Sequence, residues 1–378
     1  MPGKSHRLAG YGLFLAAALF AARADAAADP KKIADALVAA LSASGKSTGS
    51  YTAATASGND IVITNLKSSP ADKSGDAVVP TVVISGAADR SPGGFTATKM
   101  TFNKGSAVND KDTVTWQTGS ITDAVVPSAD EIKAKAKLRP FSKLSMGGIN
   151  VKGPDMAAPV DIVSVDAVIG DVIDGTPSDI KLTTVGLKLP GALFDDPEVQ
   201  GVLKALGYTE FVVGINLDGG LDAAADVVTI RTLTVDVASV GKLALTGKFS
   251  GVSVRGLTSD KSDEAASKAR IDSLTFRFDN AGVVEKALDM QAKMTGSTSK
   301  QVVTELTGAL PFMLSLIGNE AFEGKVAKAA TDFLNAPKSI TIKAAPAKPV
   351  SLEEIGAALS DDPSKLPDLL VVDITANN

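Results

Sequence analysis

Short runs of β-branched and aliphatic residues, separated by glycine, asparagine, aspartate and proline, recur along most of this chain. Such runs are typical of strands that end in tight turns, and their close spacing favours antiparallel pairing of neighbours. In the first part of the chain they cover residues 51–57, 60–66, 81–85, 95–103 and 113–122. Further along they cover residues 143–152, 161–172, 179–189, 210–217, 227–237, 242–249, 273–278, 338–344 and 369–375. The pattern predicts a long antiparallel meander.

Two local patterns add detail to the second series of strands. The stretch Asp218-Gly-Gly-Leu-Asp222 interrupts two alternating runs, which predicts a hairpin connection there. A weak repeat also occurs, because Lys143-Leu144-x3-Gly148-Ile149-x-Val151-x-Gly153 returns as Lys181-Leu182-x3-Gly186-Leu187-x-Leu189-x-Gly191. Its first half occurs once more, as Lys242-Leu243-x3-Gly247. Two interpretations stay open: a strand-and-turn unit reused along the meander, or coincidence in a sequence rich in glycine and lysine.

Helices are predicted at four places where capping residues precede a helical spacing of apolar residues. Asp29-Pro30 opens the first helix, the capping box Ser128-x-x-Glu131 opens a short one to Lys137, and Asp196-Pro197 opens a third that ends at Gly207. The fourth place is the C-terminal part of the chain, with helices at 283–294, 299–317 and 320–334 and a further capping box at 351–354. The fold class expected is α+β: a long curved antiparallel meander with mainly C-terminal helices packed on its concave face.

The N-terminus has the pattern of a bacterial secretory signal peptide. Lys4 and Arg7 precede the apolar run 8–22, and Ala24-Asp25-Ala26 fits the small-x-small cleavage rule. The apolar run is shorter than the roughly 20 residues that a membrane-spanning helix needs, so we expect cleavage and no integral span afterwards. The predicted organisation is a signal peptide at 1–26, a helix and meander at 27–140, and a second meander with a helical layer at 141–378. The two meanders either form one continuous sheet or stand as separate domains. The expected location is the periplasm, with the extracellular space as the alternative.

Composition narrows the chemistry that the exported chain can perform. Cysteine is absent, and the single histidine, His6, lies in the leader. Catalytic triads, Cys-His dyads, zinc sites and thiol redox chemistry are therefore excluded from the mature chain. Removal of residues 1–26 lowers Lys+Arg from 38 to 35 and Asp+Glu from 43 to 42, which leaves a net charge of −7 without basic runs. That charge argues against a nucleic-acid partner.

No catalytic residue, cofactor or metal site is predicted. The acidic residues Asp161, Asp166 and Asp171 cluster in sequence, but strand alternation places Asp166 on the face opposite the other two. Aromatic residues make up only 4% of the chain, which argues against a sugar-binding cleft. A hydrolase that uses two carboxylates stays open as an alternative, and so does a surface or envelope interaction module without a small ligand.

The leading hypothesis is a non-catalytic envelope protein that binds a lipid or another apolar ligand in a groove between sheet and helices. An apolar fraction of 44% with few aromatic residues suits aliphatic packing. The run from Leu306 to Gly318 is too short to cross a bilayer and contains Pro311. It is interpreted either as part of a buried helix hairpin or as a lid, floor or membrane contact for the ligand. The candidate ligand-contacting residues are Leu306, Leu310, Phe312, Met313, Leu316 and Ile317.

Several segments of the second half resemble uncharacterised secreted proteins of alphaproteobacteria. The segments that carry this resemblance are 207–208, 216–218, 229–233, 241–245, 274–279, 338–342, 345–349 and 366–370. It covers roughly residues 142–378, and the meander is more distantly similar to AsmA-like and YdgA-like envelope proteins. The resemblance implies a periplasmic β-rich protein, and the AsmA-like likeness implies a link to envelope lipids. It transfers no active site, because none of these segments is a catalytic motif.

Overall fold

The computed structural model describes residues 28–109, 111–253 and 268–378. The chain divides into two compact units, which meet between Leu193 and Phe194. The predicted signal peptide at 1–26 lies outside the described residues. In each unit the described strands pair antiparallel, and most of the helices lie in the second unit, so the predicted α+β class with an antiparallel meander is confirmed.

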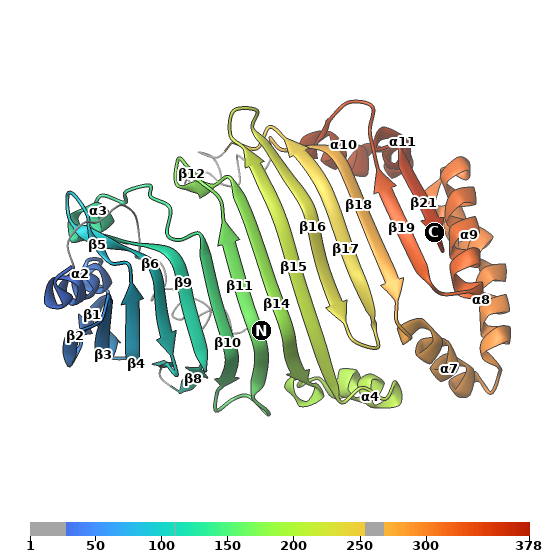
Figure 1. Cartoon of the computed structure of the whole chain (residues 1–378). Helices are drawn as coiled ribbons and strands as arrows, with labels where there is room; N and C mark the ends of the chain where they lie inside the picture. Colours follow the sequence, from blue (N-terminus) through green and yellow to red (C-terminus); the bar gives the residue numbers. More distant parts are fainter. Residues whose placement is uncertain (1–27, 110, 254–267) are drawn as a thin grey trace. The chain divides into compact units, whose positions relative to one another are not determined.

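The first unit is a twisted antiparallel meander with one long helix at its start (Figure 1). Strand β3 pairs with β1, β2 and β4, and the order continues through β6, β9, β10 and β11 to β14. Its elements are α2 (Pro30–Ser42), β1 (Ser47–Ser50), β2 (Ala53–Ser57), β3 (Asp60–Pro70), β4 (Ala77–Ser85), β5 (Ala88–Asp89), β6 (Gly94–Asn103), β7 (Ser106–Asn109), β8 (Asp112–Thr115), β9 (Thr118–Pro127), α3 (Ala129–Lys133), β10 (Lys143–Lys152), β11 (Val160–Ile169), β12 (Val172–Ile173), β13 (Thr176–Pro177) and β14 (Asp179–Pro190). Because β10 pairs with β9, the strands on both sides of residue 140 belong to one sheet.

Helix α2 closes the core of the first unit. Asp29 accepts a hydrogen bond from the Lys31 amide at 2.9 Å, and Pro30 occupies the first turn, as the sequence predicted. Ile33 and Leu37 face the sheet and are almost completely buried. Among the strand residues in contact with this core, Ile63 and Phe95 have no exposed surface. The first unit therefore has a closed apolar interior.

Several predicted boundaries in the first unit are wrong. The run 161–172 is not one strand, because β11 ends at Ile169 and β12 covers Val172–Ile173. The run 113–122 is not one strand, because β8 ends at Thr115 and β9 begins at Thr118. Between them the Trp116 indole donates to the Phe102 carbonyl at 2.7 Å. The capping box at Ser128 and Glu131 is confirmed, but α3 ends at Lys133 instead of Lys137. The cause of the early end is local: Lys135 has a φ of +52°, which a right-handed helix cannot contain.

The repeated motif has a structural counterpart across β11. Strands β10 and β14 flank β11 on its two sides, and the equivalent residues of the two copies that pair with β11 face the same β11 residues. Lys143 and Lys181 both pair with Val168, for example. The repeated glycines, Gly148 and Gly186, have φ values of +60° and +61°. The first two copies are thus one strand unit used twice, with a left-handed glycine at the same level of the sheet.

We expect Gly186→Ala to destabilise the first unit by about 1–2 kcal/mol, because a Cβ is strained at positive φ. The added Cβ would also lie 2.6 Å from the Val163 Cγ2 atom. Gly186→Asn adds the same Cβ, but asparagine tolerates the left-handed region better, so its cost should be smaller. Urea unfolding followed by the fluorescence of Trp116 measures both variants. An equal loss in the two variants would contradict the role of the backbone conformation.

The described residues of the second unit form an antiparallel meander with helices at its C-terminal side (Figure 1). Its strands follow the order β15, β16, β17, β18, β19 and β21, and the short β20 pairs with the start of β18. Its elements are α4 (Pro197–Ala205), β15 (Glu210–Asp222), β16 (Val227–Val237), β17 (Gly241–Ser250), β18 (Arg270–Asn280), α7 (Val283–Thr295), α8 (Ser299–Leu314), η3 (Ser315–Ile317), α9 (Glu320–Asn335), β19 (Ser339–Ala344), β20 (Val350–Ser351), α10 (Leu352–Asp361), η4 (Pro363–Lys365), α11 (Leu366–Leu369) and β21 (Val372–Ala376).

The predicted hairpin connection at Asp218–Asp222 is wrong. Strand β15 continues through these residues to Asp222, and the shift in pairing between Asp218 and Gly219 marks a bulge. The turn follows at residues 223–226, where the Asp222 side chain accepts hydrogen bonds from the amides of Ala224 and Ala225. The pair Gly219-Gly220 correctly indicated an irregularity in the strand, but glycines occur in bulges as well as in turns, so they did not indicate which of the two forms here.

Helices α7, α8 and α9 form a layer on the last strands. Helix α9 packs against β21 and β19, while α8 packs against α7 and α9. Left-handed glycines separate these helices: Gly296 lies between α7 and α8, and Gly318 lies before α9. The predicted helix positions are confirmed within a few residues. Within the described part of the chain, none of the helices combines the length and apolar character that crossing a membrane requires.

Candidate functional site: an apolar sheet face

One face of the sheet in the second unit carries two continuous rows of apolar side chains. The pairing register places one residue from each of the six strands in each row. The first row is Ile215, Val235, Leu243, Phe278, Ile340 and Ala376, and the second is Leu217, Leu233, Leu245, Phe276, Ile342 and Ile374. Residues of the two rows are two positions apart on every strand, so they share one face. We call these twelve side chains the apolar rows.

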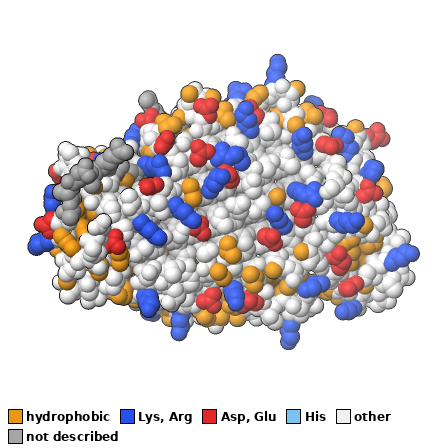
Figure 2. Space-filling model, in the orientation of Figure 1, with side chains coloured by type: hydrophobic (Ala, Val, Ile, Leu, Met, Phe, Trp, Pro, Cys, Tyr) orange, Lys and Arg blue, Asp and Glu red, His pale blue; other side chains and the backbone are white. Residues whose placement is uncertain are grey.

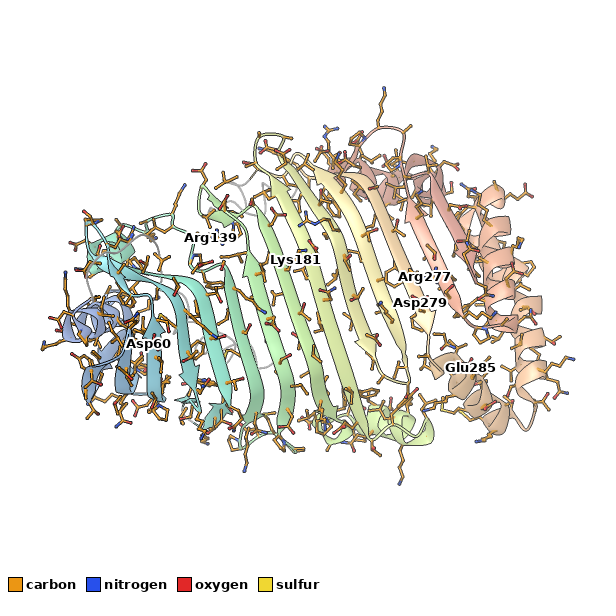
Figure 3. The ribbon with its side chains drawn as sticks, in the orientation of Figure 1. Asp60, Arg139, Lys181, Arg277, Asp279 and Glu285 are labelled. Atoms are coloured by element: carbon orange, nitrogen blue, oxygen red, sulfur yellow. The ribbon has the colours of Figure 1, made fainter. Side chains whose placement is uncertain are left out.

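The opposite face of the same sheet is polar. Between the apolar rows lie Asn216, Thr234, Ala244, Arg277, Thr341 and Thr375, which pair across the six strands in that order. Figure 3 labels Arg277 and Asp279 on β18. Acidic and basic side chains are spread over the visible surface instead of gathering in one patch (Figure 2). The sheet is thus amphipathic: successive residues of each strand point to opposite faces, so one face is apolar and the other is polar.

Arg277 organises the polar face near the C-terminus. Its Nε donates to an Asp279 carboxylate oxygen at 2.8 Å, its Nη1 to the Thr341 hydroxyl at 3.3 Å, and its Nη2 to the Asn378 carbonyl at 3.1 Å. The hydrogen bond to Asp279 raises the pKa of the guanidinium above its ordinary value. These contacts hold β18, β19 and the end of the chain together, which is a structural task.

The apolar rows differ from the core of the first unit in their burial. All twelve side chains keep some exposed surface, and Leu243 and Ile342 are 41% and 39% exposed. In the first unit, Ile63 on β3 and Ile84 on β4 also lie on the apolar face of their sheet, but they have no exposed surface. The second sheet therefore presents to solvent an aliphatic face of the kind that the first unit covers.

The helical layer explains where this face is covered and where it is open. The Phe333 ring of α9 meets the Phe278 ring edge to face, with 6.3 Å between their centroids. Helix α9 thus packs against β21 and β19 and reaches Phe278 on β18, although Ile342 on β19 stays 39% exposed. The side chains on β15, β16 and β17 stay half exposed beside it. This open part is lined by Ile215, Leu217, Leu233, Val235, Leu243 and Leu245.

The residues predicted as ligand contacts lie elsewhere on the second unit. All are on α8 or η3, and α8 packs against other helices. Leu310 and Ile317 are half-buried, whereas Leu306 is 41% and Met313 58% exposed. Phe312 and Leu316 are the most exposed, at 84% and 90%. None of the twelve residues of the apolar rows was predicted as a ligand contact, because the alternation of apolar residues shows which ones share a face and not which rows align.

Acidic groups of the first unit occupy separate positions. Asp166 accepts a hydrogen bond from the Ser145 hydroxyl and pairs with Lys143 at 2.9 Å, and both contacts hold the pKa of this carboxyl below its usual range. Asp161 accepts from the Asn150 amide, and Asp171 pairs with Arg139. Over residues 28–109, 111–253 and 268–378, no group of three or more histidine, cysteine, aspartate or glutamate side chains could hold a metal ion.

A small cavity of about 170 Å³ lies beside α3. It is lined by Pro127, Glu131, Ile132, Lys135, Ala136, Leu138 and Pro140. Its volume is below the range of about 300–1,000 Å³ that ligand pockets usually have. Its one carboxylate, Glu131, is already engaged with Arg90 through two hydrogen bonds of 2.6 and 2.7 Å. This carboxylate is therefore not available to orient a ligand in the cavity.

Comparison with known proteins gives a family match in the second half of the chain. A family described only as "Uncharacterized protein" matches residues 234–377, which run from β16 to the end of β21. The match contains most of the strands that carry the apolar rows and all three helices of the C-terminal layer. Among curated proteins nothing matches this chain.

Proposed function

We propose that this chain is an exported, non-catalytic protein of the bacterial envelope that holds the acyl chain of a lipid on the open part of its apolar rows. The observation that carries the proposal is the unbroken aliphatic strip across β15, β16 and β17, half exposed beside α9. Burial of such a strip under an acyl chain would remove apolar surface from water. The leader pattern at residues 1–26 supports export, and the resemblance to AsmA-like proteins agrees with a lipid ligand.

The dimensions of the open strip suit most of one acyl chain. Strand spacings of about 4.8 Å make each row about 10 Å long from β15 to β17. A bilayer core about 30 Å thick holds two acyl chains end to end, so one chain extends about 15 Å. At β18 the Phe333 ring of α9 meets the Phe278 ring. The strip thus accommodates about two thirds of an extended acyl chain and shares its aliphatic character.

The carboxylate hydrolase is the less favoured alternative. A general acid of that kind needs a carboxyl group whose pKa is raised by an apolar environment or a like charge. Two carboxyls of the first unit have the opposite shift: hydrogen bonds from Arg90 lower the pKa of Glu131, and hydrogen bonds from Ser145 and Lys143 lower the pKa of Asp166. The structure therefore offers the hydrolase no proton donor at these positions.

Binding of cis-parinaric acid, a fluorescent polyene fatty acid, tests the proposal with the full mature chain. We expect wild-type protein to enhance the fluorescence of the probe, and Leu243→Asn with Leu245→Asn to weaken binding by roughly tenfold or more, because two amides would lie in the path of the chain. Native mass spectrometry of protein purified without detergent should also show bound lipid, and the double variant should show less of it.

A matched control lies on the same strand and the opposite face. Lys242→Asn with Thr246→Asn changes two residues of β17 that flank the same positions but belong to the polar face. This control should bind the probe like wild type. Equal probe binding by the apolar-face variant, the control and wild type would contradict the proposed site, provided that circular dichroism shows the same fold for all three.

A further inference from the structure

The end of the C-terminal helix hairpin is an exposed apolar tip. We define the helix tip as residues 311–317, the last turn of α8 together with η3. Phe312 and Leu316 are four positions apart and are 84% and 90% exposed, and Met313 beside them is 58% exposed. Such exposure of neighbouring large apolar side chains marks a contact surface on a soluble unit.

The helix tip is anchored to the rest of the second unit. After Gly318, the Asn319 side chain donates to the Ser364 carbonyl and to the Asp368 carboxylate, both at 3.0 Å, and accepts from the Phe322 amide at 3.1 Å. These bonds connect the turn to η4, α11 and the start of α9 at once. The exposed side chains are therefore presented by a braced turn, and their apolar surface is not free to fold back onto the sheet.

Charge indicates which surface the helix tip fits. No charged residue occurs between Glu305 and Glu320, and both of these flanking charges are negative. At the anchored turn, Asp368 contacts Asn319, and Lys365 is paired with Asp362 at 3.1 Å. A helix that binds anionic lipid usually carries lysine and arginine beside its apolar residues, and the tip has none. Protein hot spots are enriched in tryptophan, tyrosine and arginine, which the tip also lacks.

We infer that the helix tip inserts Phe312, Met313 and Leu316 into the surface of an electrically neutral phospholipid bilayer. The apolar side chains enter the boundary between headgroups and acyl chains, while the flanking glutamates stay in water. This contact goes beyond the acyl-chain site on the sheet, since it uses other residues and needs no bound lipid. It gives the unit a point of attachment to a membrane without a spanning helix.

Flotation of the full mature chain with vesicles tests the inference. Wild-type protein should float with vesicles of pure phosphatidylcholine, with little change between low and high salt, because the contact is apolar. Addition of anionic phosphatidylglycerol should not increase binding. The double variant Phe312→Ser with Leu316→Ser should bind vesicles about a hundredfold more weakly, because it removes two large apolar side chains from the lipid. The matched control is Met294→Ser in α7, which replaces a side chain that is 75% exposed outside the tip, and it should bind like wild type.

Two results would overturn the inference: absence of wild-type flotation with neutral vesicles, or unchanged flotation of the tip variant. Sedimentation velocity gives a third test, because concentration-dependent dimers that disappear in the tip variant would assign the tip to a second copy of the chain. The cis-parinaric acid measurement separates this inference from the proposed function. The tip variant should still bind the probe like wild type, whereas the Leu243 and Leu245 variant should lose the probe and keep its vesicle binding.

Discussion

Replacement of Ile63 by asparagine is expected to destabilise the first unit by about 4–7 kcal/mol. The loss combines the cavity left by a large aliphatic side chain with the burial of an amide that has no partner. Ile63 has no exposed surface and contributes to the core beneath α2. Because whole domains are stable by only about 5–15 kcal/mol, this variant should be unfolded or close to it at neutral pH. Trp116, the single tryptophan, lies in this core and reports the change by its fluorescence.

Replacement of Leu243 in the second unit by asparagine should have only a small effect on stability. Leu243 is 41% exposed, so Leu243→Asn is expected to lower the free energy of unfolding by about 1 kcal/mol. Thermal unfolding followed by circular dichroism measures this change. The pair of variants thus compares two strand residues, each on the apolar face of its sheet, that differ in whether a layer covers them. A cost of several kcal/mol for Leu243→Asn would mean that the apolar rows are a closed core, and it would remove the basis of the proposed lipid site.

Replacement of Glu131 by glutamine is expected to destabilise the first unit by about 3–5 kcal/mol at neutral pH. Glu131 accepts two hydrogen bonds from the Arg90 guanidinium, and these side chains are only 15% and 13% exposed. Loss of the negative charge leaves the Arg90 cation in poorly hydrated surroundings without its counter-ion. Glu131 also accepts from the Ser128 amide in the capping box of α3. Urea unfolding followed by Trp116 fluorescence measures the loss.

The effect of Glu131 should depend on pH with a definite sign. Hydrogen bonds from Arg90 come first among the causes that lower the pKa of Glu131 in the folded chain. A carboxyl group with a lowered pKa contributes stability above its unfolded pKa of about 4.3, and this contribution is lost as the pH falls through the folded value. Wild type and Glu131→Gln should therefore converge in stability below about pH 4. The exposed Asp130→Asn serves as control, since its ion pair with Lys133 spans 3.8 Å at the surface. A constant difference between wild type and Glu131→Gln at all pH values would contradict this account.

Local signals predicted most helices well and turns less well. Asp29, Ser128 and Ser351 cap helices as expected, because a capping side chain and the amide that it satisfies are two or three residues apart. The hairpin predicted at Asp218–Asp222 failed for a different reason. Glycine permits a bulge as readily as a turn, and only the partner strand β16 decides between them.

The candidate site shows where sequence reasoning ends. Alternation in the runs around Ile215, Val235 and Leu243 shows that each strand has one apolar face. The two rows arise only when neighbouring strands are aligned, and the alignment depends on pairings between residues up to 66 positions apart, such as Phe276 with Ile342. The same limit applies to the run from Leu306 to Ile317, where only the positions of α7 and α9 decide which side chains are exposed.

The sequence by itself determined the elements and the chemistry of this protein. Strand alternation and helix caps are local, and the lack of cysteine, together with the confinement of histidine to His6, sets the available side-chain chemistry without any structure. Only the tertiary structure decided which apolar face is closed. Helix α2 seals the first sheet around Ile63, whereas α9 stops over β18 and leaves Leu243 half exposed. Burial depends on which layers meet in space, and that is not encoded in the pattern of any single strand.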